Sequence, residues 1–368
     1  MTKIIDAGLL VRPGILDIQP YRGGESDIPG AKRVIKLTSN ESALGPSPIA
    51  MAAYRNAAAE MHRYPDGHCM ALRQALASRY GLDINRIVCG AGSDELIGLL
   101  CKAFSGPGDE VLYSQHGFLM YPISARAAGA TPVWAEESEL TTNVDALLDK
   151  VTKRTRIVFV ANPNNPTGTY LPAKEMARLH AGLRDDILLV IDAAYAEYIG
   201  QNDYTNGAKL VEAHGNVVMT RTFSKIFAMG GLRLGWSYCP SAVADVLNRV
   251  RGPFNVSTAA QAAGAAALRD VGTIGRAKAH NDTWLAWITM KLRAMGLTVG
   301  DSVGNFVLIR FPQATAHNAT AADAFLKSRG IILRAMAGYG LSDSLRMTIG
   351  TEEEMQIVNN ALREFMAR

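Results

Sequence analysis

The sequence has few cysteines, no long apolar run and no block of like charge, and each absence excludes a class of protein. Cysteine occurs four times in 368 residues, without the close spacing of metal ligands, so we predict neither a disulfide scaffold nor a metal site. No apolar run approaches the roughly 20 residues that cross a bilayer. Near the N-terminus, Asp6, Arg12 and Pro13 interrupt what would be the apolar core of a signal peptide. We therefore expect a cytoplasmic protein with no membrane partner.

The charge pattern gives no sign of a nucleic-acid partner. The 38 basic and 34 acidic residues are interspersed and leave a net charge of +4, whereas nucleic-acid tails carry basic blocks. With 48% hydrophobic residues, the composition is that of an ordinary globular protein. At roughly 150 residues per domain, the length favours about two domains.

Short runs of branched apolar residues predict the strands of one large domain. These runs lie at 87–89, 110–113, 132–135, 156–160, 187–191 and 217–220, and helix-like segments such as 94–104 and 173–183 separate most of them. Strands that alternate with helices form a mainly parallel sheet covered by helices. We therefore predict an α/β domain at residues 46–275.

The pattern changes after residue 275 and predicts a smaller α+β domain. A long helix-like stretch precedes strand candidates at 305–311, 331–334 and 345–349. The last helix opens with Thr351 and Glu354 at the spacing of a capping box. The first 45 residues, rich in Gly and Pro, look like an arm plus one strand. We assign residues 1–45 and 276–368 to this second domain.

Two polar segments follow neighbouring strands of the predicted sheet. The run Asn-Pro-Asn-Asn-Pro-Thr-Gly at 162–168 comes after one strand, and Asp192, with Tyr195 three residues later, ends the next. Ligands of open α/β sheets bind at such carboxyl ends. A carboxylate there needs a cationic partner if it is buried, and a protonated pyridine nitrogen would supply one. The alternatives are an ordinary turn at 162–168 and a helix N-cap at Asp192.

Lys225 stands at the end of a further strand among hydroxyl and glycine residues. It follows Thr222 and Ser224, and a glycine-rich run with Arg233 comes next. A lysine desolvated there has a lowered pKa, so its neutral amine can attack an aldehyde. The hydroxyls and the guanidinium suit a phosphate ester. Taken alone, Lys225 is more often an exposed surface lysine.

The turn at 90–95, Gly-Ala-Gly-Ser-Asp-Glu, joins a strand to a helix. Free N–H groups and the helix dipole at such a turn favour an anion. An N-cap by Ser93 explains the same residues, and the Gly-Lys-Ser/Thr ending of a P-loop is missing.

Taken together, these segments resemble the fold-type I pyridoxal-phosphate-dependent aminotransferases, and among them the histidinol-phosphate aminotransferase subfamily. The resemblance implies a seven-stranded, mainly parallel sheet between helices in the large domain. It covers most of the chain, through motifs at 20–21, 37–41, 63–65, 92–95, 162–168, 192 and 195, 221–225, 231–233, 305–306, 332–334 and 345–346.

The resemblance also implies the catalytic roles. Lys225 would hold pyridoxal 5'-phosphate as a Schiff base and move the proton between Cα and the C4′ atom of the cofactor. Asp192 would keep the pyridine nitrogen protonated, so that the ring accepts electrons. Asn165 and Tyr195 would bond the phenolic oxygen, and Phe118 would stack on the ring, although many relatives have Tyr there. The phosphate would be held by Gly92, Ser93, Asp94, Thr222, Ser224 and Arg233, with Tyr64 reaching across the interface of a homodimer.

Substrate choice would depend on Tyr21, Asn165, Arg334 and Arg346. Glutamate presents a carboxylate where histidinol phosphate presents a phosphate ester, and a guanidinium binds either anion. The expected reaction is the ping-pong exchange of an amino group between L-histidinol phosphate and 2-oxoglutarate in histidine biosynthesis.

Three alternatives stay open. An aromatic amino acid transaminase or a threonine-phosphate decarboxylase would have the same fold. A non-catalytic cofactor-binding regulator would be expected to lack Lys225 or Asp192 and to carry an added domain.

Overall fold

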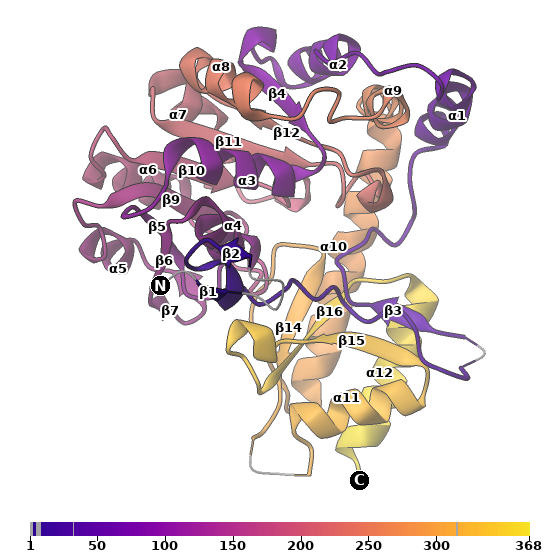
Figure 1. Cartoon of the computed structure of the whole chain (residues 1–368). Coiled ribbons are helices and arrows are strands. Elements are labelled where there is room, and N and C mark those ends of the chain that lie inside the picture. The colour runs from indigo at the N-terminus through magenta and orange to yellow at the C-terminus, as the bar shows by residue number, and fades with distance from the viewer. Residues whose placement is uncertain (1–2, 5–8, 32, 314–315) are drawn as a thin grey trace.

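The structure, a computed structural model, describes residues 3–4, 9–31, 33–313 and 316–368. Figure 1 shows a larger part above and a smaller part below, each built on a sheet with helices, and the long helix α10 (Val271–Ala294) runs between them. The predicted fold class, an α/β part with a smaller α+β part, is confirmed. The predicted domain boundary after residue 275 falls inside α10, and the boundaries stay a prediction.

The larger sheet has seven strands within the described residues, in the order β4-β12-β11-β10-β9-β5-β6. The six strands expected from the sequence are confirmed, with ends that differ by one or two residues. The sheet is parallel except at β12, which runs antiparallel to both neighbours. The strands are β4 (Ile87–Gly90), β5 (Glu110–Ser114), β6 (Thr131–Ala135), β9 (Thr155–Ala161), β10 (Leu188–Asp192), β11 (Val217–Thr222) and β12 (Gly235–Tyr238).

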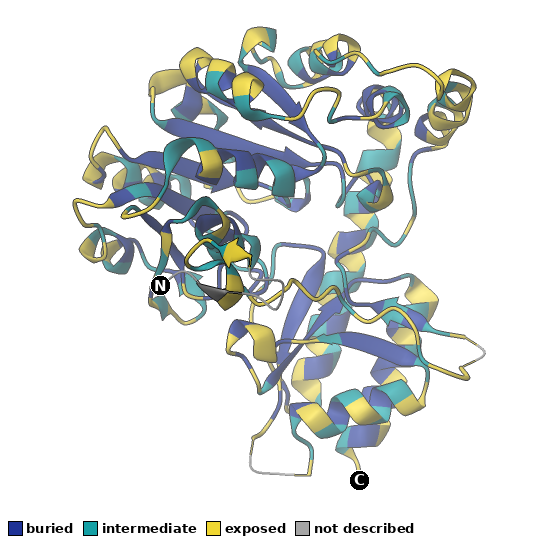
Figure 2. Ribbon diagram, in the orientation of Figure 1, coloured by how far each residue is buried: buried dark blue, intermediate teal, exposed yellow. Residues whose placement is uncertain are grey.

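Helices cover both faces of this sheet, which explains why most of its strands read as unbroken apolar runs. Figure 2 shows the strands as buried beneath partly exposed helices. One face packs against α3 (Ser93–Phe104), α4 (Met120–Ala128) and α8 (Ser241–Val250). The opposite face packs against α1 (Pro48–Ala57), α2 (Met70–Tyr80), α5 (Val144–Asp149), α6 (Ala173–Gly182), α7 (Ala208–Ala213) and α9 (Thr258–Ala267).

The smaller sheet has five strands in the described part of the chain, in the order β13-β14-β16-β15-β3. These are β13 (Thr298–Val299), β14 (Phe306–Arg310), β16 (Ser344–Thr348), β15 (Ile331–Ala335) and β3 (Ile35–Leu37). The N-terminal strand β3 pairs in parallel with β15, so the first residues complete the smaller part as expected. One face packs on α10, α11 (Ala319–Ser328) and α12 (Glu352–Met366). The capping box of Thr351 and Glu354 at the start of α12 is confirmed.

Short elements complete the chain. They are the strands β1 (Lys3–Ile4), β2 (Leu10–Val11), β7 (Glu137–Ser138) and β8 (Thr141–Thr142), and the 3₁₀ helices η1 (Ile15–Asp17), η2 (Ala58–Glu60), η3 (Ile84–Arg86), η4 (Ala196–Tyr198), η5 (Gly230–Leu232) and η6 (Ala337–Tyr339).

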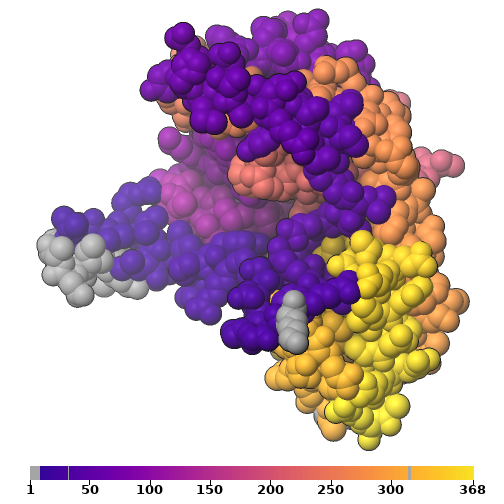
Figure 3. Space-filling view, turned by 90° about the vertical axis from the view of Figure 1, so that its right-hand side faces the viewer, coloured from indigo at the N-terminus to yellow at the C-terminus, as the bar shows by residue number. Residues whose placement is uncertain are grey.

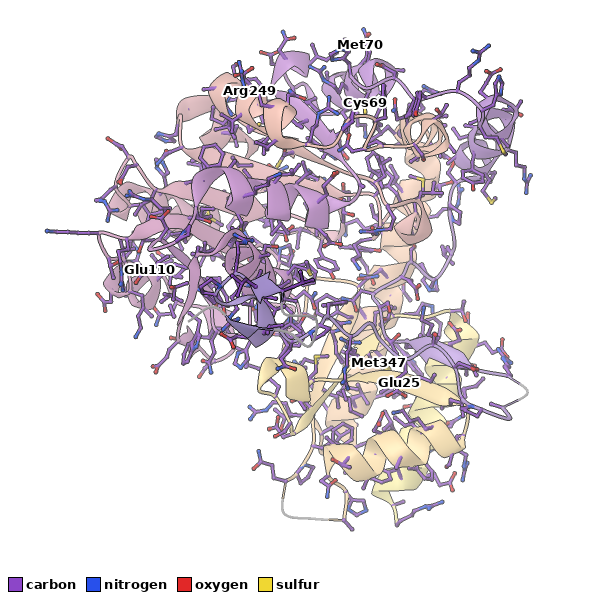
Figure 4. All side chains as sticks on the ribbon, in the orientation of Figure 1. Glu25, Cys69, Met70, Glu110, Arg249 and Met347 are labelled. Atoms are coloured by element: carbon purple, nitrogen blue, oxygen red, sulfur yellow. The ribbon has the colours of Figure 1, made fainter. Side chains whose placement is uncertain are left out.

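The N-terminal arm extends from the body and links the two parts. Figure 3 shows the indigo segment projecting sideways from the molecule. Arg12 donates a hydrogen bond to the carbonyl of Ala127 in the larger part, at 2.5 Å. Further along, Glu25 lies beside the smaller sheet (Figure 4) and pairs with Lys327 of α11 at 2.9 Å. The arm therefore passes from one part to the other.

All four cysteines are buried, free thiols in the larger part. Cys69 and Cys89 belong to the core on one face of the larger sheet, and Cys101 and Cys239 to the core on the other. Among the described residues, no helix combines the length and apolar character required to cross a membrane.

Candidate active site

A cleft of about 300 Å³ is lined by both parts of the molecule, in the size range of small-molecule sites. Its walls come from the arm, from the turns after β9, β10 and β11, and from β15 and β16. The cleft brings together most of the residues singled out from the sequence: Tyr21, Ser93, Asp94, Phe118, Asn165, Asp192, Tyr195, Thr222, Ser224, Lys225, Arg233, Arg334 and Arg346.

Asp192 is a buried carboxylate at the end of β10. The Tyr121 hydroxyl donates to its Oδ2 at 2.9 Å, and the Thr220 hydroxyl donates to its Oδ1 at 3.3 Å. Burial raises the pKa of Asp192 to about 6, against the lowering effect of the hydrogen bond from Tyr121. Among the described residues no cation forms an ion pair with it. A cationic ligand atom at this position would therefore favour the ionised carboxylate.

The Lys225 ammonium lies in the cleft, just beyond the end of β11. Its Nζ donates to the carbonyl of Ser39 at 3.1 Å and stands 5.7 Å from the centre of the Tyr195 ring. Desolvation by burial, followed by the positive charge of Arg346, lowers the pKa of Lys225 to about 8. A neutral amine, the form that attacks carbonyl carbons, is thus accessible near physiological pH.

Tyr195 and Asn165 line the cleft together with Asp192 and Lys225, and each has a donor left over. The Tyr195 hydroxyl accepts a hydrogen bond from Asn40 Nδ2 at 2.8 Å, so its own proton is left to donate elsewhere. The Asn165 side-chain oxygen accepts from Arg346, which leaves its amide nitrogen to donate as well. Burial raises the pKa of Tyr195 to about 12, so its hydroxyl keeps its proton at neutral pH.

Donors for an anion gather at the N-terminus of α3. Ser93 is the first residue of the helix and Gly92 precedes it, so the alternative in which Ser93 caps the helix is wrong. The Thr222 hydroxyl donates to Ser224 Oγ at 3.0 Å, and Arg233 reaches the same atom at 3.5 Å. Free N–H groups at a helix start, two hydroxyls and a guanidinium form a site suited to a phosphate.

Glycine is required where these segments converge. Gly92 has a φ of +88°, and a Cβ there would lie 2.3 Å from Nη2 of Arg233. A Cβ on Gly235 of β12 would lie 2.4 Å from the backbone nitrogen of Ser93. Gly92 thus lies behind the cleft wall, where only a residue without a side chain leaves room for the guanidinium.

Arg346 and Arg334 are direct partners in the register of β15 and β16. Arg346 is 5% exposed, donates to the carbonyl of Thr38 at 2.7 Å, and leaves its Nε without a partner among the described residues. Burial lowers its pKa. Arg334 is half-buried and donates to the carbonyl of Arg22 at 2.6 Å. Within the described part of the chain neither guanidinium has an ion-pair partner, so both are available to anions.

Aromatic side chains form further walls of the cleft. Phe118 is half-buried and packs edge-on against Tyr121, with ring centres 5.9 Å apart. Tyr21 of the arm is 50% exposed, and Tyr339 of η6 is buried in the wall beside Arg346. Phe118 thus lines the cleft, and its stacking on a cofactor ring stays a prediction.

Tyr64 does not line the cleft of its own chain. Its side chain is 82% exposed and stacks on Phe254, with ring centres 4.8 Å apart. The predicted contact with the phosphate site of a neighbouring chain therefore stays a prediction.

Sequence reasoning gave no role to two residues that organise the site. Asn40 bonds Tyr195, and Tyr121 bonds Asp192. Asn40 lies within the segment 37–41, which the sequence analysis singled out, and Tyr121 comes three residues after Phe118. Each carries a polar group in a segment whose other members had predicted roles, and this was the only sequence signal for them. Their partners could not be read from the sequence, because Tyr195 is 155 residues from Asn40 and Asp192 is 71 residues from Tyr121.

Known proteins resemble this chain over nearly its full length. The family model for aminotransferase class I and II matches residues 32–362. A histidinol-phosphate aminotransferase of Paramagnetospirillum magneticum is 64% identical over 96% of this chain and 98% of that protein. The one from Rhodospirillum centenum is 59% identical over 98% and 99%. The crystal structure of histidinol-phosphate aminotransferase from Sinorhizobium meliloti in complex with pyridoxal-5'-phosphate has a TM-score of 0.84 at 26% identity, covering 91% of this chain and 92% of that one.

Proposed function

Because the chain belongs to the class I and II aminotransferases, we propose that it exchanges the amino group between L-histidinol phosphate and 2-oxoglutarate, with pyridoxal 5'-phosphate as cofactor. Relatives with 59 and 64% identity carry the name of this activity. One observation supports it most strongly: Arg334 and Arg346, two cations without ion-pair partners among the described residues, face the cleft that holds Lys225. Both proposed substrates carry anionic groups that such a site would bind.

The residues of the cleft fit pyridoxal phosphate. Asp192 is a buried carboxylate without a cation among the described residues, as a protonated pyridine nitrogen requires. The space that a Cβ on Gly92 would fill is kept for Arg233, beside the donors suited to a phosphate. When bound, the cofactor supplies an aldehyde that condenses with amines and a ring that takes up electrons.

Each residue would then have one task. Lys225 Nζ would hold the aldehyde carbon of the cofactor and would move the proton at the substrate Cα. Asp192 would keep the proton on the pyridine nitrogen. Tyr195 and Asn165 would donate to the phenolic oxygen, since each has a donor left over. Phe118 would limit the movement of the ring.

One anion pocket would serve both half-reactions. Arg346 is buried and held by Thr38 and Asn165, so its guanidinium is fixed before the substrate arrives. Arg334, opposite on β15, would bind a second anionic group. Tyr21 of the arm would cover the pocket from the solvent side.

A screen of amino donors and acceptors tests the proposal. We expect the purified protein to be yellow and to prefer histidinol phosphate over phenylalanine, with 2-oxoglutarate as acceptor. Threonine phosphate should give no carbon dioxide. The Lys225→Ala variant should lose both the visible absorbance and steady turnover. Preference for phenylalanine, or carbon dioxide release, would replace the proposal with one of the alternatives on the same fold.

We also propose that two chains pair around the face that carries Tyr64. Large apolar side chains are exposed there, namely Ile49, Tyr54, Met61, Tyr64 and Phe254, at 44 to 82%. Of these, Tyr64 stacks on Phe254. Large exposed apolar side chains that gather on a surface usually mark an interaction site. A second copy of the chain would cover it and bring its Tyr64 to the phosphate site.

A further inference from the structure

A small cavity lies apart from the cleft, where α10 meets the start of β14 and the end of β16. Its walls come from α10, which includes Asn281, from η4 and from residues 42–44. Asn305, just before β14, and Ile349, just after β16, complete them. It holds about 10 Å³ of space for the centre of a water molecule. One buried water needs roughly 10–15 Å³ by this measure.

Two buried amides line this cavity, and the oxygen of each lacks a donor. Asn281 is 4% exposed and Asn305 is 2% exposed. The Oδ1 atom of each has no hydrogen-bond partner among the described residues. Leaving a buried acceptor without a donor is unfavourable, and native proteins seldom do so.

Rotation of the amides would not remove the problem. Asn281 Nδ2 donates to the carbonyl of Gly304 at 3.1 Å. Asn305 Nδ2 donates to the carbonyls of Asn40 and Glu41, at 3.0 and 3.3 Å. A flipped amide would turn its oxygen toward these carbonyl oxygens. Both Oδ1 atoms therefore keep their places, and none of the described residues donates to them.

We propose that one buried water molecule occupies this cavity and donates a hydrogen bond to each of the two oxygens, Asn281 Oδ1 and Asn305 Oδ1. Water has two donor hydrogens, which matches two acceptors. No carboxylate is among the described residues that line the cavity, so the site offers nothing to balance the charge of a cation.

The water has a further task, which rests on the proposed function. Asn305 holds the carbonyls of Asn40 and Glu41, and the segment 38–41 contacts three candidate site residues. The carbonyl of Thr38 accepts from Arg346, that of Ser39 accepts from Lys225, and the Asn40 side chain donates to Tyr195. By fixing the Asn305 amide, the water positions this wall of the cleft. Asn305 is thus a positioning residue, which acts on the candidate site residues through the backbone of the segment 38–41.

A crystal structure of the cofactor-loaded protein, at a resolution that shows ordered water, tests the site. We expect one density peak within about 3.2 Å of both Oδ1 atoms. An empty cavity would overturn the proposal, as would a peak surrounded by many oxygens at the shorter distances of a metal ion.

The variant Asn281→Leu tests the positioning task. We expect it to lose the water, to lower the midpoint of thermal unfolding by a few degrees, and to shift the pH midpoint of the cofactor's visible absorbance. The matched control is Asn359→Leu, because Asn359 on α12 is also a buried amide whose oxygen has no partner among the described residues, but it does not line this cavity. It should lower thermal stability without moving the absorbance midpoint.

The possible outcomes distinguish a failure of the positioning task from a failure of the proposed function. If both variants change only thermal stability, Asn305 has no positioning task. If neither variant shifts the absorbance and no amino donor is turned over by the unmodified protein, the proposed function fails, while the density peak still decides the water site.

Discussion

At the residue scale, the reactivity of Lys225 depends on its surroundings. An ordinary lysine has a pKa of about 10.4, and burial together with the charge of Arg346 lowers that of Lys225 to about 8. At pH 7 about one amine in ten is then neutral, against about one in 2,500 for an unperturbed lysine. The same ammonium would be a poor nucleophile on the protein surface.

We predict that protein stripped of cofactor takes up pyridoxal phosphate faster as the pH rises from about 6.5 to 9, with a midpoint near 8. Only the neutral amine attacks the aldehyde, and a lowered pKa brings that form to lower pH. Stopped-flow visible absorbance measures the rate. Arg346→Leu should move the midpoint upward because it removes a nearby positive charge. A midpoint near 10 in the unmodified protein would contradict the assignment.

Arg346→Ala should impair both half-reactions. Losing a buried, charged hydrogen-bond partner costs about 2 to 5 kcal/mol, or roughly 30-fold to several thousand-fold in apparent affinity. Arg334→Ala should affect histidinol phosphate and glutamate more than phenylalanine, if Arg334 binds a second anion. Pre-steady-state measurement of each half-reaction separates these effects. Unchanged rates with Arg346→Ala would mean that the anion site lies elsewhere.

At the element scale, the turn from β4 into α3 depends on a glycine that lies behind the cleft. Gly92→Ala should weaken cofactor binding at least about tenfold, because the φ of +88° disfavours alanine and the new Cβ would displace Arg233. Titration of the stripped protein measures the affinity. Gly98→Ala, in the middle of α3 with open space at its Cβ position, is the control. It should leave cofactor affinity unchanged and raise stability by up to about 1 kcal/mol. Equal affinity in both variants would argue against an anion site at this turn.

The sequence predicted most strands of the larger sheet because burial on both faces makes them apolar throughout. It did not predict β12, since Gly235 and Ser237 break the apolar pattern and the strand follows a glycine-rich run. The polar residues at strand ends were found for a similar reason: order along the chain places them at one edge of the sheet. Asn40 and Tyr121 were not found because their roles depend on partners that only the folded chain brings near.

At the scale of the whole molecule, the proposed pairing of chains makes a test by complementation possible. Lys225→Ala and Tyr64→Ala should each reduce activity strongly when pure. If Tyr64 acts across a twofold interface, a mixed dimer of the two variants has one site with both natural residues. Mixing them under exchange conditions should then restore up to about a quarter of the unmodified activity. No recovery, together with a fully active monomer in sedimentation, would refute the shared site.

Because the four cysteines are buried free thiols, their reactivity can be used to measure local unfolding of the protein. A thiol reagent can label a buried sulfur only while the surrounding structure is locally unfolded. The labelling rate therefore measures how often that local unfolding occurs. The thiols lie on both faces of the larger sheet, whereas the smaller part has none. The signal therefore reports on the larger part alone. Cofactor binding should slow the labelling of Cys89 most, because this residue lies in β4, directly before the turn proposed to hold the phosphate. Mass spectrometry of timed samples would show which thiol reacts first.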